Sequence, residues 1–112
     1  MNDPRKIVVH AGCGKAVLPE VRFPAAEWRE IRFDIDVDVR PDVVGSLTDM
    51  GGIESNSVDA VYSSHNLEHL HAHEVPVALR EFLRLLRPGG VAVIVVPDLQ
   101  VAGELLAADR GD

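Results

Sequence analysis

Four histidines and two glutamates lie close together between residues 65 and 74, and they are the side chains best suited to acid–base or metal chemistry. An unperturbed imidazole titrates near neutrality, so a histidine in this segment can take a proton from a substrate. Histidine and carboxylate groups also bind zinc. A third interpretation is that these are ordinary loop histidines beside a pocket.

The sequence His65-x-x-Glu68-His69 matches the inverted zinc-protease pattern. On a helix, His65 and His69 would share one face and form a workable pair of zinc ligands. Zinc catalysis also needs a third protein ligand and an open coordination position, and no distant partner is evident in the sequence. We therefore assign no metal and treat His69, His65 and Glu68 as candidate catalytic residues. A zinc-dependent hydrolase remains an alternative.

A glycine turn follows the first apolar segment of the chain. Residues 7–9 are typical of a buried parallel strand, and Gly12-Cys13-Gly14 comes soon after them. Glycines at such a place let the backbone turn sharply and let a ligand approach. Val17 stands where a dinucleotide fingerprint needs a small residue, whereas Val9 and Ala16 stand where a P-loop needs glycine and serine or threonine. The turn therefore favours an uncharged or zwitterionic adenosine-type ligand, or it binds nothing.

Aspartates at predicted strand ends give the glycine turn a partner. Asp34 lies twenty residues after Gly14, which is the spacing of the acidic residue that accepts hydrogen bonds from ribose hydroxyls in doubly wound folds. Asp36 is the second candidate for this role. Asp49 could accept from an adenine amino group, with Leu47 or Met50 packed on the ring face. The alternative is that these carboxylates are solvated charges.

The elements that must position these residues alternate between strands and connections. Strands are predicted at 7–9, 30–36, 43–44, 57–63 and 91–96, and a helix at 74–87, with a weak helical region at 15–29 interrupted by Pro19 and Pro24. Such alternation predicts an α/β fold with a Rossmann-like, doubly wound, mostly parallel sheet of about five strands. Because only six residues separate positions 36 and 43, the third strand must be short, irregularly placed or not parallel.

Length and composition limit the classes of protein to consider. The 112 residues suffice for one domain, 1–112, whose tail we expect to be disordered from about residue 107. The net charge of −7 argues against binding to nucleic acid or to an anionic membrane. No segment approaches the roughly 20 apolar residues of a membrane span. The single cysteine suits a reducing cytoplasm, where we expect the protein to act.

Five segments in order resemble the class I S-adenosylmethionine-dependent methyltransferases. They are Ala11-Gly12-Cys13-Gly14, Asp34, Leu47-Thr48-Asp49, residues 58–70 and Leu85-Leu86-Arg87-Pro88-Gly89-Gly90. The resemblance implies that Gly12 and Gly14 abut the methionine part of the cofactor, and it places Asp34 on the ribose and Asp49 near the adenine. It also implies that Ser64 and His65 line the pocket beside the sulfonium.

The resemblance gives a full set of candidate cofactor-binding residues. They are His10, Gly12, Cys13, Gly14, Asp34, Ile35, Thr48, Asp49, Met50, Ser64 and His65. Two positions depart from the family pattern, because His10 stands where that family often has an acidic residue and Ala16 where it often has a third glycine. We expect the chain to be a methyltransferase, or its cofactor-binding core, that acts on a small-molecule acceptor. A non-catalytic module that binds S-adenosylmethionine or S-adenosylhomocysteine is an alternative.

The predicted sheet is truncated relative to that family, whose sheet has about seven strands. We therefore expect residues 91–96 to leave an unprotected apolar edge, which is a liability for association. Such an edge predicts either a homodimer formed through this strand or a chain that is part of a longer protein.

Overall fold

The computed structural model of the protein describes residues 3–96 and 101–106. In chain order the elements are β1 (Lys6–Ala11), β2 (Trp28–Asp34), the 3₁₀ helix η1 (Val37–Val39), β3 (Val43–Val44), β4 (Val58–Ser64), the 3₁₀ helix η2 (Leu67–His69), α1 (Val75–Leu85), β5 (Leu86–Val96) and β6 (Val101–Leu106). The expected disorder from residue 107 falls outside the described residues.

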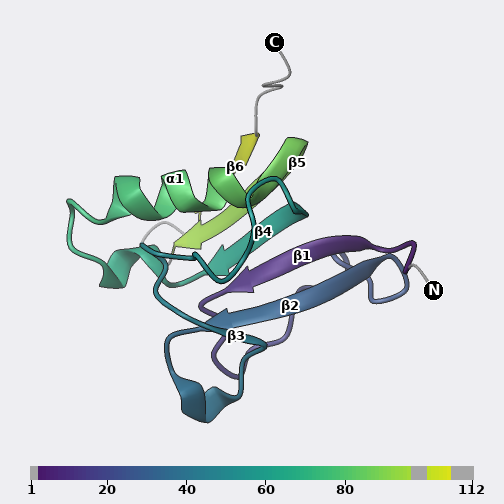
Figure 1. Ribbon diagram of the computed structural model, residues 1–112, viewed down its shortest axis with the longest axis horizontal. Helices are drawn as coiled ribbons and strands as arrows, with labels where there is room; N and C mark the ends of the chain where they lie inside the picture. Colours follow the sequence, from purple (N-terminus) through teal and green to yellow (C-terminus); the bar gives the residue numbers. More distant parts are fainter. Residues whose placement is uncertain (1–2, 97–100, 107–112) are drawn as a thin grey trace.

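The strands form one sheet with the order β3-β2-β1-β4-β5-β6 (Figure 1). The first five strands are parallel, and β6 runs antiparallel to β5. The strand order reverses between β1 and β4, since the chain moves outward from β1 to β3 and then returns to place β4 on the other side. This topology confirms the predicted α/β Rossmann-like class.

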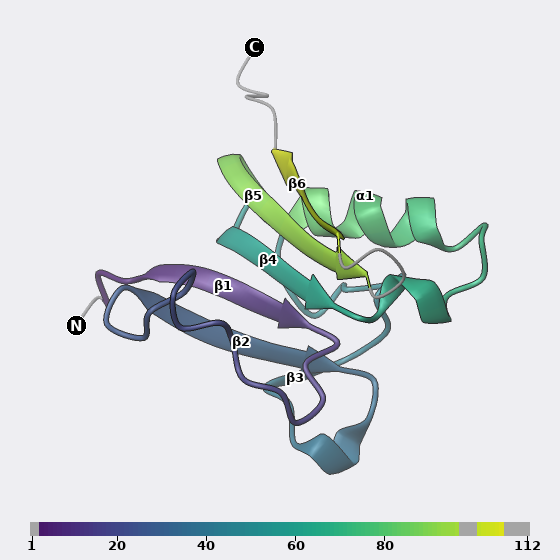
Figure 2. The ribbon, with the colours of Figure 1, turned by 180° about the vertical axis from the view of Figure 1, so that it is seen from behind.

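The two faces of the sheet are covered differently. Helix α1 packs on one face, where Ala78, Phe82 and Leu85 are buried with apolar side chains of β1, β2 and β4. The opposite face has a smaller cluster of Val8, Phe23, Ala60 and Val93, and Figure 2 shows the β1–β2 connection lying across it.

Within residues 3–96 and 101–106, no helix is long and apolar enough to cross a membrane.

The β1–β2 connection contains no helix, so the predicted weak helical region at 15–29 is wrong. The carbonyl of Pro19 accepts from the Phe23 amide, and the carbonyl of Pro24 accepts from the amides of Glu27 and Trp28. These are isolated turns, because each proline lacks the amide hydrogen that a continuous helix would need. Phe23 then packs edge-on against Trp28, with ring centroids 5.0 Å apart, and covers the sheet in place of a helix.

The third strand is short, as its narrow spacing in the sequence requires. Strand β2 ends at Asp34, and η1 follows, closed by Arg40 in the left-handed conformation with φ of 54°. Only Val43 and Val44 then pair with β2, in parallel with Phe33 and Asp34. A connection this compact brings the ends of β2 and β3 to the same edge of the sheet.

The expected free edge of residues 91–96 is wrong, because β6 covers it. The antiparallel register pairs Val91 with Leu106 and Val96 with Val101, so the whole of the predicted strand is hydrogen-bonded to its own chain. A two-strand hairpin needs only a short connection, which is why six further residues suffice to protect the edge. The unprotected edge on which the expected homodimer depended is therefore absent at β5.

Helix α1 also holds the connection between β3 and β4 through two polar residues, Glu81 and Arg84. Arg84 donates to the carbonyls of Met50, at 2.9 Å, and Ile53, at 3.2 Å, and its guanidinium pairs with Glu81. Glu81 in turn accepts from the Met50 amide at 2.6 Å. This connection carries the residues that follow β3, so α1 fixes them in place.

Replacing Arg84 with methionine removes hydrogen bonds from two buried carbonyls and should lower the free energy of unfolding by about 2 kcal/mol. Urea denaturation measures this loss. The exposed Arg80, on the same helix, provides the control, since Arg80→Met should change stability little. Equal effects of the two substitutions would contradict the anchoring role of Arg84.

The same pair makes stability depend on pH. The Arg84 hydrogen bond holds the pKa of Glu81 below its ordinary value of 4.5. A depressed pKa in the folded state stabilises the protein above pH 4.5, and this contribution is lost as the pH falls through the folded value. Arg84→Met should therefore flatten the decline of stability on the acid side of pH 5, whereas an unchanged acid profile would show that the pair contributes nothing.

Candidate functional site

A cavity of about 190 Å³ lies at the carboxyl edge of the sheet, where β1 to β4 end. It is lined by Gly12, Asp34, Ile35, Gly45, Ser46, Leu47, Asn66, His69 and Leu70. The cavity adjoins the ends of β1 and β4, which is the point where the strand order reverses and where open α/β sheets bind ligands. Most of its lining comes from loops that the strand ends hold in place.

The glycine turn after β1 is fastened to the end of β2. The amides of Gly12 and Cys13 both donate to the carbonyl of Phe33, at 2.8 and 3.1 Å, and the Gly14 amide donates to Oδ2 of Asp34 at 2.8 Å. Gly12 and Gly14 have φ of 70° and 50°, values that favour glycine. The turn is therefore ordered by the protein itself, before any ligand is considered.

Asn66 supports the turn from the β4 side. Its side-chain nitrogen Nδ2 lies 3.1 Å from the Ala11 carbonyl, 3.1 Å from the Ser63 hydroxyl and 2.9 Å from the Ser64 carbonyl. A Cβ on Gly12 would lie 2.5 Å from Cγ of this asparagine, so the side chain occupies the space that only glycine leaves. Asn66 therefore links the carboxyl ends of the two central strands.

Asp34 presents its carboxylate to the cavity, and Asp36 does not. Oδ1 of Asp34 accepts from the Asp36 amide at 2.9 Å and Oδ2 from the Gly14 amide, which leaves a second lone pair on each oxygen. Asp36 instead caps η1 by accepting from the Asp38 amide, and it is exposed. Asp34 is therefore the acidic residue that can meet hydroxyl groups of a ligand in this cavity.

Apolar side chains form the other part of the wall. Ile35 is 72% exposed although it is large and apolar, and it lines the cavity together with Leu47 and Leu70. A carboxylate beside apolar side chains fits a nucleoside, whose ribose is polar and whose base is flat. The cavity is smaller than the roughly 300 Å³ at the lower end of small-molecule pockets. These residues therefore fit the nucleoside part of a ligand and leave the remainder uncovered.

A polar network behind the glycine turn holds the segment that follows it. One Arg32 nitrogen donates to the carbonyls of Gly14 and Ala16, at 3.1 and 2.7 Å. Another donates at 2.8 Å to Oε2 of Glu30, which also lies 2.8 Å from Nδ1 of His10. Because Glu30 and Arg32 are two residues apart on β2, both side chains reach the same face of the sheet.

His10 belongs to this network and does not line the cavity. Its ring is buried and packs edge-on against Tyr62, with centroids 5.3 Å apart. Burial lowers the pKa of His10, and the hydrogen bond that His10 makes to the Glu30 carboxylate opposes that effect. The structure therefore places His10 off the cavity, since alternation along β1 directs this side chain to the opposite face from that of Val9 and Ala11.

Five other candidate residues also lie off the cavity wall, and one of them is Gly14, whose amide donates to Asp34. Cys13 is buried, and burial raises the pKa of its thiol, so only its backbone serves the turn. Met50 is fully buried in the main core, because Glu81 and Arg84 hold its backbone against α1. The hydroxyl of Thr48 lies 2.8 Å from that of Ser46, and the exposed Asp49 accepts from the Gly51 amide.

The histidine segment does not form the helix that a zinc pair would need. His65 has φ of 60° and donates its amide to the Val95 carbonyl at 2.8 Å, and only Leu67–His69 then form a 3₁₀ turn. His69 lines the cavity, with Nε2 3.7 Å from a carboxylate oxygen of Glu68. His65, Ser64 and Glu68 are not part of that lining.

A metal centre has no support in the described part of the chain. Among these residues, no group of three or more histidine, cysteine or acidic side chains is arranged to hold a metal ion. His71 and His73 stack in parallel, with ring centroids 5.8 Å apart, and neither lines the cavity.

Sequence reasoning gave no role to four residues that the structure brings to the cavity, namely Gly45, Ser46, Asn66 and Leu70. Gly45 and Ser46 directly follow β3, and Asn66 follows β4 by two residues. Their position just after a strand could have identified these three residues from the sequence, because the carboxyl ends of parallel strands meet at one edge of the sheet. Leu70 lies further along the chain and carried no such signal.

Comparison with known proteins gives one family match and many structural ones. The family model described as "Methyltransferase domain" matches residues 9–94. A putative S-adenosyl-L-methionine-dependent methyltransferase from Methanococcus maripaludis has 19% identity and a TM-score of 0.66, covering 84% of this chain and 49% of that one. No curated protein matches the sequence.

Two further solved structures share the fold. The putative methyltransferase of Haloferax volcanii, solved in complex with the Trm112 methyltransferase activator, has 22% identity and a TM-score of 0.66, covering 81% of this chain and 45% of that one. The [4+2]-cyclase SpnF has 20% identity and a TM-score of 0.67, covering 84% of this chain and 39% of that one. The chain thus spans half or less of the length of these proteins.

Two glycine substitutions separate backbone strain from steric conflict at the turn. Gly12→Ala should lower the free energy of unfolding by about 3 kcal/mol, because it adds a strained φ and displaces the Asn66 side chain from its acceptors. Gly14→Ala should cost only about 1 kcal/mol, since nothing lies within 4 Å of its added Cβ. Chemical denaturation compares the two, and equal losses would contradict the packing of Asn66 against Gly12.

Proposed function

The chain belongs to the methyltransferase domain family, and from this premise we propose that it binds S-adenosylmethionine at the carboxyl-edge cavity and transfers its methyl group to a small-molecule acceptor. The observation that carries the proposal is the position of Asp34. Its carboxylate accepts from the Gly14 amide of the glycine turn, and the residue lines the cavity beside Ile35. This arrangement suits a nucleoside, with its ribose at the carboxylate and its base against the apolar side chain.

In this proposal the residues of the chain bind and orient the ligand. The carboxylate of Asp34 accepts from ribose hydroxyls through its free lone pairs. Ile35 and Leu47 pack against the adenine. The methionine part lies along the turn, where Gly12 lines the cavity and Gly14 leaves open space beside the backbone. When bound, the cofactor supplies an activated sulfonium methyl that the lone pair of an acceptor attacks. Rigid strand ends contribute by holding this alignment.

His69 is the residue we propose as the general base for an acceptor that must lose a proton. Its side chain lines the cavity, and an imidazole nitrogen can take a proton from an acceptor held there. A carboxylate oxygen of Glu68 lies 3.7 Å from Nε2 of His69. His65 and Ser64 flank the same segment, and we retain them as neighbours of the reacting groups.

Binding of S-adenosylhomocysteine tests the proposal directly. Isothermal titration calorimetry should show saturable binding, and Asp34→Asn should weaken it about tenfold or more, because a charged acceptor is lost. Asp36→Asn is the matched control and should leave affinity unchanged, since Asp36 caps η1 away from the cavity. No heat at high micromolar ligand, or equal losses in both variants, would overturn the assignment of this site.

A non-catalytic binding module is the second candidate function, since the cavity of about 190 Å³ fits the nucleoside part of the ligand and leaves the remainder uncovered. The same fold also occurs in a protein described as a [4+2]-cyclase. Transfer of an isotopically labelled methyl group to a panel of small amines, phenols and carboxylic acids separates the two functions. Turnover that falls in His69→Gln while S-adenosylhomocysteine still binds supports catalysis, and binding without any turnover supports the module.

A further inference from the structure

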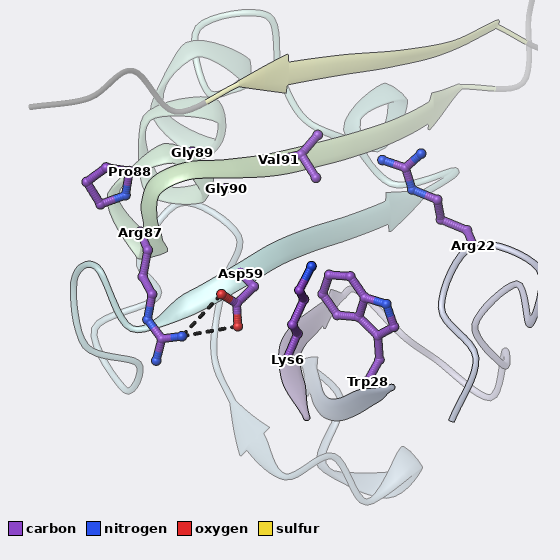
Figure 3. Close-up of a pocket in the computed structure, with 9 residues that line it drawn as sticks. All are labelled: Lys6, Arg22, Trp28, Asp59, Arg87, Pro88, Gly89, Gly90 and Val91. Carbon is purple, nitrogen blue, oxygen red and sulfur yellow. Dashed lines mark hydrogen bonds and ion pairs between the residues drawn. The ribbon is translucent and has the colours of Figure 1, made fainter. Parts of the chain in front are cut away.

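A second cavity, of about 520 Å³, lies at the opposite edge of the sheet from the glycine turn (Figure 3). It is lined by Lys6, Arg22, Trp28, Asp59, Arg87, Pro88, Gly89, Gly90 and Val91. Its volume falls within the roughly 300–1,000 Å³ of small-molecule sites. The two cavities share no lining residue, so this one is separate from the proposed methyl-transfer site.

A large bulge in β5 helps to shape the cavity. Val58 pairs with Leu86 and Ala60 with Val91, so Asp59 alone faces the four residues 87–90. Within this bulge Gly89 has φ of 86°, and nothing lies within 4 Å of the place that a Cβ would take. The bulge therefore leaves accessible backbone at the cavity. Bulges are often found next to functional sites, where they change the direction in which a side chain points.

The cavity gathers positive charge on an acidic chain. Its single carboxylate, Asp59, accepts from Nη1 of Arg87 at 3.2 and 3.1 Å and from the Ile7 amide at 2.9 Å, so its charge is already balanced. Lys6 forms no ion pair within the part of the chain that the structure describes. Figure 3 shows its side chain beside the indole of Trp28, with the ammonium 5.7 Å from the ring centroid.

We propose that this cavity binds a small organic anion through its phosphate or carboxylate groups. Lys6 and the guanidinium of Arg87, which contacts Asp59 through Nη1 alone, supply the charged donors. The indole of Trp28 and the side chain of Val91 pack against the organic part. A net charge of −7 disfavours a nucleic acid, because a polyanion would meet repulsion outside the cavity. This site goes beyond the proposed methyl transfer and does not depend on it.

Trp28 is the only tryptophan of the chain, so its fluorescence reports on this cavity alone. Titration with inorganic pyrophosphate and, separately, with citrate distinguishes phosphate from carboxylate ligands. At least one should produce a saturable change that sodium chloride of equal ionic strength does not. Lys6→Gln and Arg87→Gln should each weaken this binding about tenfold. Arg80→Gln, on α1 at the other face, is the matched control and should leave it unchanged.

Three outcomes would overturn the proposal. The first is that neither anion changes the fluorescence more than the salt control does. The second is that binding persists unchanged in Lys6→Gln, which keeps its fold because Lys6 is exposed. The third is a response to polyglutamate without any to pyrophosphate or citrate, which would make an acidic protein segment the occupant. Loss of binding in both variants with retention in Arg80→Gln supports it.

Discussion

The candidate site depends on the hydrogen bonds by which the end of β2 holds the turn after β1. The Phe33 carbonyl takes two amides of the turn, and the Asp34 carboxylate takes a third. A turn ordered in this way loses little conformational entropy when a ligand arrives, which is how preorganisation increases affinity. Asp34 therefore has two roles, because the carboxylate that faces the cavity also fixes the backbone beside it. Asn66 completes the arrangement by joining this turn to the end of β4.

The chain achieves this without a helix after its glycine turn. In doubly wound folds the glycine turn usually opens a helix that covers one face of the sheet. Here the carbonyls of Gly14 and Ala16 accept from the Arg32 guanidinium, which also donates to Glu30, and Glu30 in turn is hydrogen-bonded to His10. Polar side chains of two neighbouring strands thus do the positioning that helix hydrogen bonds would do. Phe23 and Trp28 supply the apolar cover.

Features with a strong local signal could be predicted from the sequence. The apolar runs predicted the parallel strands, and the helix predicted at 74–87 corresponds to α1 at Val75–Leu85. The spacing from Gly14 predicted Asp34 at the end of the second strand. Features set by tertiary contacts could not. Met50 lies in the core because Glu81 and Arg84 hold its backbone, and strand alternation turns His10 away from the cavity. Strand β6 was missed because Gly103 and Glu104 interrupt the apolar pattern of a short segment.

The central claim is that a nucleoside-type ligand binds where the ends of β1, β2 and β4 meet. Two-dimensional ¹⁵N NMR during titration with S-adenosylhomocysteine tests it most directly, because each backbone amide reports separately. The account predicts saturable shifts for the amides of Gly12, Ile35 and Gly45, with that of Gly89 at the opposite edge unmoved. Shifts confined to the amides around Gly89, or no shifts at all, would contradict it.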